Sequence, residues 1–265
     1  MQRIALIVAY DGTAYSGWQR QRDVPSVQEA LETALSKIHG GKPVLVMAAS
    51  RTDAGVHAQY QIAYFDSDRA YDEERWKVAI NATTPWNIQV RRAYIVAADF
   101  NPRSQNNGKH YRYLLWEGFT LPPSLLKYAV SCPPLDIERM REGAQHFVGT
   151  HNFSAFRAYD CQAAHAIRTI YDVSIERKNY IYEYPLEHEE NSLIQIDVKG
   201  TAFLKQMVRI MVGSLLDVGL GKQKPAWIAD LLEKGQRSMA GQTMPPQALC
   251  LLKIFSDLES ESPAT

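Results

Sequence analysis

Charged side chains follow an apolar stretch near residue 50, and their types and spacing could support acid–base or nucleophilic chemistry. Val44 to Ala49 is a continuous apolar run, which predicts a strand buried on both faces. Arg51 and Asp53 come directly after it, and charges at the end of a buried strand are costly unless they are paired or face a cleft. Residues i and i+2 of an extended chain point the same way, so we expect the guanidinium and the carboxylate on one side. Gly55 suits a sharp turn or a close ligand. The pattern is typical of an active-site loop at the end of a strand.

His57 lies four residues after Asp53, and this pair raises the hypothesis of a small-molecule hydrolase. The chain has no nucleophile elbow, HExxH motif or Walker loop to support that chemistry. An aspartate at a strand end also commonly caps its own turn, so Asp53 alone does not establish an enzyme.

The segment from Ser50 to Ala58 reads Ser-Arg-Thr-Asp-Ala-Gly-Val-His-Ala. It resembles the signature Gly-Arg-Thr-Asp-Ala-Gly-Val-His-Ala of the tRNA pseudouridine synthase A family. Further stretches match that family in order: Tyr10 to Gln21, Lys109 to Tyr113, Phe153 to Arg157 and Phe203 to Val218. The resemblance covers nearly the whole chain. It implies an isomerase that converts uridine to pseudouridine at positions 38, 39 and 40 of the tRNA anticodon stem-loop, as a homodimer.

The implied reaction breaks the bond between ribose C1′ and uracil N1, turns the base and rejoins it through C5. No net redox change or group transfer occurs, so we expect no cofactor and no metal. Such chemistry requires a carboxylate that stays ionised, which a nearby cation favours. Asp53 matches the family's catalytic aspartate, and its role as nucleophile or as base toward the sugar stays open. Arg51 matches a residue proposed to displace the base, and neutralising Asp53 is a second, compatible role.

Two further catalytic residues are implied by the resemblance. Tyr111 matches a tyrosine that stacks on the uracil, because the target uridine must leave its base stack before it can react. Arg209 matches an arginine that pairs with the catalytic carboxylate, which would explain a charge inside the apolar helix expected from Phe203 to Val218. Lys205, one turn earlier, is expected on the same side of that helix and is a candidate for contacting phosphate.

The remaining predicted RNA contacts are Asp11, Trp18, Gln19, Arg20 and His57. The first four lie in the stretch from Tyr10 to Gln21, which resembles the family's first motif, and His57 lies in the signature from Ser50 to Ala58. His57 could instead have a structural role, and this interpretation stays open beside RNA contact.

Two positions depart from the family pattern, because Ser50 and Ala248 stand where glycine is usual. If Ser50 required a positive φ, the loop would have to shift at a cost of about 1 kcal/mol. A catalytically silent or retargeted RNA-binding paralogue is therefore the alternative function.

Composition bounds the class of protein. The 265 residues are 46% hydrophobic, and Lys+Arg and Asp+Glu are both 29, so net charge does not indicate a polyanionic partner. A tRNA site must therefore come from local clustering of basic residues. The three cysteines have no CxxC spacing, which fits a reducing compartment and argues against structural zinc. No apolar run reaches the length of a membrane span, so we expect a cytoplasmic protein without a membrane partner.

The hydrophobic periodicity predicts an α+β protein whose two halves repeat a similar order of elements. We expect a lobe over residues 1–105 that carries the aspartate loop, a second lobe over 106–255 and a flexible tail over 256–265. The resemblance implies sheets side by side, helices packed on them and an active-site cleft between the lobes. Helices are expected after Ser26, Asp72 and Asp136, from Phe203, and from Pro225. The expected strands of the second half are His110 to Trp116, Thr169 to Glu176, Ile181 to Tyr184, Leu193 to Lys199 and Leu249 to Phe255.

Overall fold

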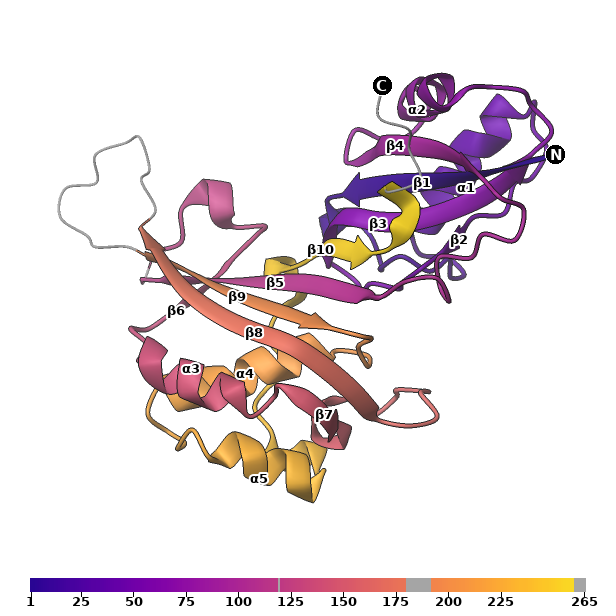
Figure 1. Cartoon of the computed structure of the whole chain (residues 1–265). Helices are drawn as coiled ribbons and strands as arrows, with labels where there is room; N and C mark the ends of the chain where they lie inside the picture. The colour runs from indigo at the N-terminus through magenta and orange to yellow at the C-terminus, as the bar shows by residue number, and fades with distance from the viewer. Residues whose placement is uncertain (119, 180–191, 260–265) are drawn as a thin grey trace. The chain divides into compact units, whose positions relative to one another are not determined.

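The computed structural model describes residues 1–118, 120–179 and 192–259, and its fold is α+β (Figure 1). The chain divides into two compact units. Unit 1 comprises Met1–Gly108 with Cys250–Thr265, and unit 2 comprises Lys109–Leu249. The strand expected over residues 181–184 lies outside the described residues. No helix in the described part of the chain is long and apolar enough to cross a membrane.

Unit 1 is built around β1 (Gln2–Tyr10), which pairs antiparallel with both β3 (His57–Ser67) and β4 (Ile88–Val96). The short β2 (Met47–Ala48) pairs antiparallel with β3. Helices α1 (Val27–Ile38) and α2 (Glu73–Asn81) pack on one face of this sheet, because Phe65 of β3 contacts both Trp76 of α2 and His39 at the end of α1.

Local signals set the ends of these helices as predicted. The Ser26 side chain accepts a hydrogen bond from the Glu29 amide at 3.3 Å, which satisfies a free donor in the first turn of α1. Asp72 caps α2 in the same way through the Arg75 amide. After α1, Gly40 and Gly41 adopt positive φ and stop the helix.

The last strand, β10 (Leu249–Phe255), pairs in parallel with β3 at Cys250 and Leu251. From Cys250 onward the strand therefore belongs to unit 1 and not, as the sequence had predicted, to the second lobe, because this pairing joins distant parts of the chain. The first residues of the expected flexible tail are ordered. Asp257–Glu259 forms a 3-10 turn whose Leu258 is buried, and residues 260–265 lie outside the described residues.

The apolar run before the aspartate loop is not a strand buried on both faces. Only Met47–Ala48 is extended and paired, and Leu45 and Met47 are 67% and 43% exposed. Val46 and Ala49 are buried. The prediction was wrong because only one face of this segment is covered, so that Val46 is buried while Leu45 and Met47 on the other face reach solvent.

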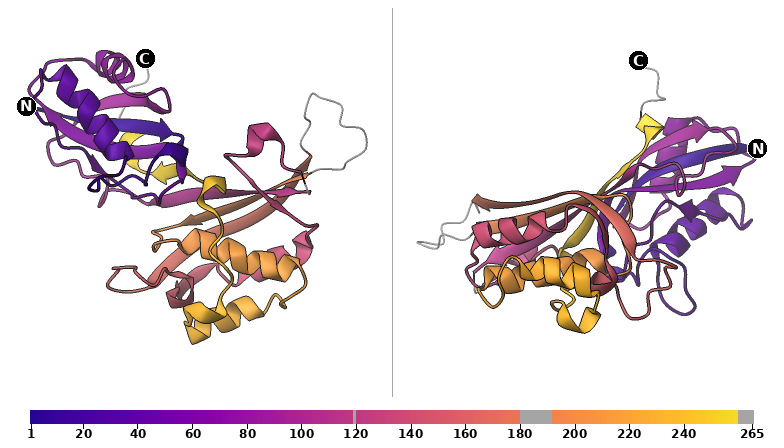
Figure 2. Two further views of the ribbon diagram at one scale, coloured as in Figure 1. Left: turned by 180° about the vertical axis from the view of Figure 1, so that it is seen from behind. Right: turned by 60° about the horizontal axis from the view of Figure 1, so that its bottom comes forward.

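Unit 2 is an antiparallel sheet of β5 (Gly108–Glu117), β9 (Ser192–Gly200), β8 (Ile167–Asn179) and β7 (Gly149–Asn152), in that order. The short β6 (Val130–Cys132) pairs in parallel with β5. Helices α3 (Ile137–Gln145), α4 (Met207–Gly219) and α5 (Trp227–Lys234) lie on one side of the sheet (Figure 2).

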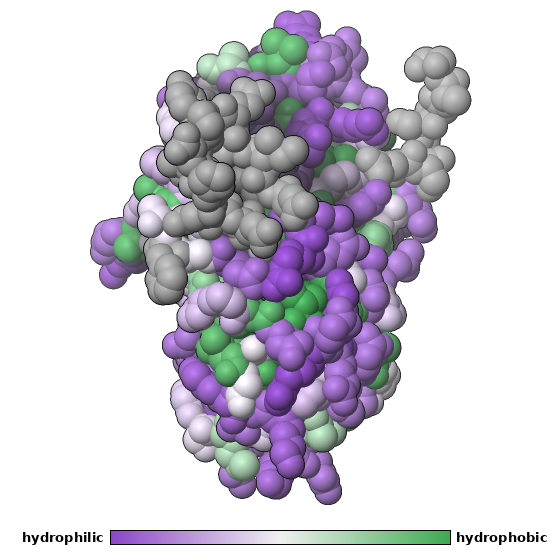
Figure 3. Space-filling model, turned by 90° about the vertical axis from the view of Figure 1, so that its left-hand side faces the viewer, coloured by the Kyte–Doolittle hydropathy of each residue, from purple (hydrophilic) through white to green (hydrophobic). Residues whose placement is uncertain are grey.

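On the surface seen in Figure 3, hydrophobic residues are exposed only in separate areas among hydrophilic ones.

Helix α4 begins at Met207 rather than at Phe203. Gln206, which precedes it, has a φ of 62° in the left-handed region and so cannot continue a helix backward. Lys205 consequently lies in the preceding turn, and the prediction that it shares a helix side with Arg209 is wrong. The apolar stripe itself is confirmed, since Ile210, Met211 and Leu215 are fully buried.

A polar network joins β5 to β9 on the face opposite Tyr111 and Tyr113. Arg112 donates two hydrogen bonds to the Asp197 carboxylate at 2.9 and 3.0 Å, and His110 Nε2 lies 2.8 Å from the same group. Burial raises the pKa of Asp197, but the hydrogen bonds from His110 and Arg112 outweigh it and hold that pKa below its ordinary value.

This network predicts an acid-sensitive contribution to stability. A carboxyl whose pKa is depressed on folding stabilises the protein above its unfolded pKa of about 3.9, and that contribution is lost as pH falls through the folded-state pKa. We expect Asp197→Asn to lower the free energy of unfolding at pH 7 by about 2 kcal/mol. The difference between variant and wild type should shrink below about pH 4. Urea unfolding at neutral and acidic pH measures it, and a pH-independent difference would contradict the assignment.

Candidate active site

Arg51, Thr52 and Asp53 lie in unit 1, in the loop between β2 and β3, and their burial alternates. Arg51 is exposed, Thr52 is 8% exposed and Asp53 is partly buried. This is the pattern of an extended segment whose middle side chain points inward and whose neighbours point outward. The extended segment ends at Gly55, whose φ is 77°, and the Val56 amide donates to the Asp53 carbonyl at 3.2 Å.

The chain from Tyr10 to Trp18 forms a base beneath this loop. The Tyr10 hydroxyl lies 2.8 Å from the Thr52 hydroxyl, and both atoms are buried. The Trp18 amide donates to the Thr52 carbonyl at 3.2 Å, and the Gly55 amide donates to the Tyr15 carbonyl at 3.1 Å. Hydrogen bonds therefore fix the loop on both sides of Asp53.

Two glycines allow the base and the loop to approach this closely. A Cβ on Gly12 would lie 2.0 Å from the Val56 carbonyl oxygen. At Gly17, where φ is 94°, a Cβ would lie 2.5 Å from the Thr52 carbonyl oxygen. Both distances are far below van der Waals contact, so only glycine fits either position.

His57 belongs to the same support. Its ring is 4% exposed, and Nδ1 lies 3.1 Å from the Gly12 amide and 3.2 Å from an Asp11 carboxylate oxygen. Nδ1 can accept from the amide when it carries a lone pair, or donate to Asp11 when it is protonated. Of the two roles left open for His57, this burial favours the structural one, and it leaves the hydrolase hypothesis without an exposed base.

The predicted RNA contacts in the first motif differ in exposure. Trp18 is 2% exposed and its ring packs beside Tyr10 at 5.9 Å, which indicates a structural role for this ring, and its contact with RNA stays a prediction. Gln19 is half-buried and donates to Gln28 of α1. Arg20 is exposed and pairs with Glu32 at 3.0 Å, which offsets part of its charge.

The expected ion pair between Arg51 and Asp53 is not found. Within residues 1–118, 120–179 and 192–259, Arg51 makes no hydrogen bond or ion pair. Its guanidinium extends into solvent from the residue two positions before Asp53. The role of neutralising Asp53 is therefore not observed, and a role toward a ligand stays a prediction.

In unit 2, Tyr111 lies on β5 on the same face as Tyr113 and Leu115, as the alternation predicted. Its ring is 6% exposed and meets Phe203 edge to face at 5.1 Å. Tyr113 Oη donates to the Pro245 carbonyl at 2.8 Å, and burial raises the pKa of this hydroxyl above its ordinary value. Tyr113 is thus a core residue, and Tyr111 lies at the end of the same buried row.

Arg209 and Lys205 have different surroundings in unit 2. The Arg209 Nε donates to the Met244 carbonyl at 2.6 Å, and the Met244 amide donates back to the Arg209 carbonyl. This anchors a partly buried guanidinium on α4. Lys205 is exposed and bonded to Asp160 at 2.6 Å, and this hydrogen bond lowers the pKa of Asp160. Arg209 and Asp53 belong to different units, so their contact stays a prediction.

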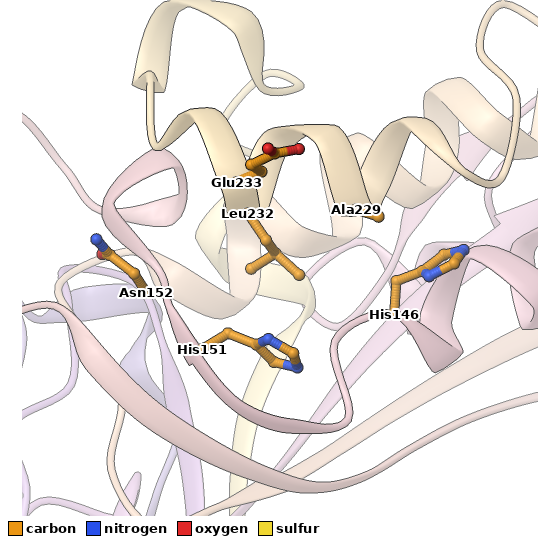
Figure 4. A pocket seen from close by; sticks show the side chains of 6 residues that line it. All are labelled: His146, His151, Asn152, Ala229, Leu232 and Glu233. Carbon is orange, nitrogen blue, oxygen red and sulfur yellow. The ribbon is translucent and has the colours of Figure 1, made fainter.

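A pocket of about 310 Å³ lies elsewhere in unit 2 (Figure 4). Its lining residues are His146, His151, Asn152, Ala229, Leu232 and Glu233. Leu232 points toward His151, whereas the Glu233 carboxylate points away (Figure 4). In the described part of the chain no group of three or more His, Cys, Asp or Glu residues could hold a metal ion. None of the predicted site residues lines this pocket.

Comparison with known proteins decides the family. A family model described as tRNA pseudouridine synthase matches residues 6–103 and 144–255, which include Asp53, its supporting loop and Arg209. The chain belongs to this family. It is 41% identical over 96% of its length to tRNA pseudouridine synthase A of Myxococcus xanthus, of which 92% is covered. The corresponding protein of Shewanella woodyi is 41% identical over 95% of this chain and 92% covered, and that of Geotalea uraniireducens is 39% identical over 96% and fully (100%) covered.

Among solved structures, a Cbf5-Nop10-Gar1 complex matches with a TM-score of 0.30 and 12% identity, over 96% of this chain and 60% of that one. The chain thus spans less than two thirds of that protein's length.

The two replaced glycines of the family pattern cause no backbone strain. Among described residues other than glycine, only Asp23 and Gln206 have positive φ, so neither Ser50 nor Ala248 does. The Ser50 carbonyl accepts a hydrogen bond from Gln61 at 2.9 Å, and Ala248 is buried in a 3-10 turn. The loop therefore needs no shift to accommodate serine.

Sequence reasoning identified the outward residues of the loop but missed the ones that hold it. Thr52, Tyr10, Gly12 and Gly17 were part of the matching motifs, yet no role was assigned to them. The spacing of the two glycines around an aromatic segment was the available signal, because such glycines often mark close backbone approach.

Proposed function

We propose that this protein isomerises uridine to pseudouridine at positions 38, 39 and 40 of the tRNA anticodon stem-loop. The observation that carries the proposal is the Arg51-Thr52-Asp53 loop, held on a buried base with Arg51 exposed and Asp53 partly buried, in a chain 41% identical to proteins named tRNA pseudouridine synthase A. This function requires a carboxylate beside a flipped-out nucleoside and no redox partner.

In the proposed reaction, the bond from C1′ to N1 breaks, the uracil turns, and C1′ bonds to C5. The proton leaves C5 and N1 gains one, so atoms and charge balance within the nucleotide and solvent. Asp53 either adds to the sugar or removes a proton from it. Arg209 is proposed to pair with Asp53 and hold it ionised, and the hydrogen bond to Met244 would keep its guanidinium in place.

The remaining contacts extend the same proposal to the RNA. Tyr111 would stack on the flipped uracil, with its ring held by Phe203. Arg20 and Lys205 are exposed cations suited to phosphate, and Gln19 and Asp11 are partly exposed polar residues proposed to contact the RNA as well. We propose a cytoplasmic homodimer, following the family resemblance. Sedimentation equilibrium at micromolar concentration tests the dimer, and a single monomeric species would refute it.

The experiment that tests the function is incubation of the wild type with unmodified tRNA transcripts, followed by mapping of pseudouridine at each position. We expect product at positions 38 to 40 where the transcript carries uridine there. Transcripts with cytidine at these positions provide the matched control and should give none. Tight binding without product would instead indicate a catalytically silent RNA-binding relative.

Arg51 provides a prediction that separates two kinds of RNA contact. If its guanidinium displaces the base, Arg51→Ala should reduce the single-turnover rate about 10- to 100-fold while the salt dependence of tRNA binding stays the same. If it binds phosphate, affinity should fall and the slope of log Kd against log salt should drop by about one. We expect the first result. Single-turnover assays and filter binding at several salt concentrations distinguish them, with Arg103→Ala as the control for an exposed arginine of unit 1.

A further inference from the structure

Of the three loop residues Arg51, Thr52 and Asp53, only Thr52 is buried. It is 8% exposed and lies between an exposed arginine and a partly buried aspartate. Its hydroxyl lies 2.8 Å from the hydroxyl of Tyr10, which is 4% exposed. A buried hydroxyl needs a partner, so this pair is the arrangement that makes burial of both groups favourable.

Tyr10 is a rigid point of attachment. It is the last residue of β1, which has partner strands on both sides, and it is in register with Ala58 of β3 and Ile88 of β4. Its ring also packs beside the buried Trp18. The Tyr10 hydroxyl therefore has little freedom to follow a moving loop.

Two kinds of contact restrain the loop. The Trp18 amide holds the Thr52 carbonyl, which fixes the position of the main chain. The hydroxyl pair adds a second restraint, through the Thr52 side chain, against rotation of the segment about its own axis. Because neighbouring side chains of an extended segment point to opposite sides, such a rotation would swing Asp53 away.

We propose that Tyr10 and Thr52 are positioning residues that set the direction of the Asp53 carboxylate through their shared hydrogen bond. The proposal rests on the proposed function of Asp53. It assigns no contact with RNA to either residue. Displacement of a reacting group by about 1 Å can cost about 100-fold in rate, so loss of the pair should slow the chemical step and leave tRNA binding largely unchanged.

The test uses Thr52→Val and Tyr10→Phe, which keep the side-chain shape and remove one hydroxyl each. We expect single-turnover rates to fall about 10- to 100-fold, with the Kd for tRNA within about threefold of wild type. Thr52→Ser, which restores the hydroxyl, should recover most of the rate. The double variant should be no slower than either single one, because both substitutions break the same bond.

Thr150→Val is the matched control. It removes one member of another hydroxyl pair at 2.8 Å, an exposed one between Thr150 and Thr169 of unit 2, and should leave the rate unchanged. Thermal melting shows whether each variant is folded. A normal rate in folded Thr52→Val, or multiplicative losses in the double variant, would overturn the positioning role alone. Absence of product from the wild type would overturn the proposed function and this role with it.

Discussion

Asp53→Asn is expected to reduce pseudouridine formation by at least about 10³-fold. Asparagine has nearly the same shape as aspartate but carries no charge, so it can neither add to the sugar as a nucleophile nor remove a proton. The Thr52 and Gly55 contacts that hold the loop do not involve the Asp53 side chain and should persist. Single-turnover assays with position-specific mapping of the product measure the loss.

Two controls make this result specific. Asp68→Asn removes an exposed carboxylate elsewhere in unit 1 and should have no effect on rate. Binding of tRNA to Asp53→Asn should remain within a few fold of wild type, because a carboxylate adds no affinity for phosphate. Rates near wild type in the Asp53 variant would refute its assignment as the catalytic residue.

Gly17→Ala is the second substitution with a large expected effect, and it acts through structure. The added Cβ would lie 2.5 Å from the Thr52 carbonyl oxygen, on a backbone whose φ is 94°. Left-handed strain and overpacking together should destabilise the protein by about 2 to 5 kcal/mol. Because the loop must separate from its base to relieve the clash, activity should fall as well. Urea unfolding and single-turnover rates give the two effects.

Gly40→Ala is a control that introduces left-handed backbone strain without a steric clash. Gly40 also has a positive φ, 68°, but nothing lies within 4 Å of the position of an added Cβ. We expect a loss of only about 1 kcal/mol and no change in rate. Equal losses in both variants would mean that the contact between Gly17 and the aspartate loop is unimportant.

The stretch from Tyr10 to Gln21, which was predicted to contact RNA, also has a structural role in supporting the aspartate loop. Trp18 and His57 are buried at 2% and 4% exposure, and they support the loop from below. Of the other predicted residues in this segment, Arg20 is exposed, and Gln19 and Asp11 are partly exposed. The segment is therefore first a base for Asp53, and its contacts with RNA stay a prediction.

Elements that depend on local interactions were predictable. Ser26, Asp72 and Asp136 cap their helices because a side-chain oxygen reaches an amide three residues on. The alternation along β5 depends only on strand geometry. In contrast, the start of α4 depends on the backbone angle of Gln206, and the surroundings of residues 44–49 depend on which strands pair with them. Neither feature can be predicted from a short stretch of sequence.

The candidate active site shows the same difference between local and long-range interactions. By itself, the sequence determined which residue types could react, since Arg51 and Asp53 follow an apolar run and Gly55 after them favours a turn. Only the tertiary structure decided what holds them. The Tyr10–Thr52 bond spans 42 residues and the contact of Gly12 with His57 spans 45. Such contacts form only after β1 and β3 pair, and side-chain periodicity carries no information about partners so far apart in the chain.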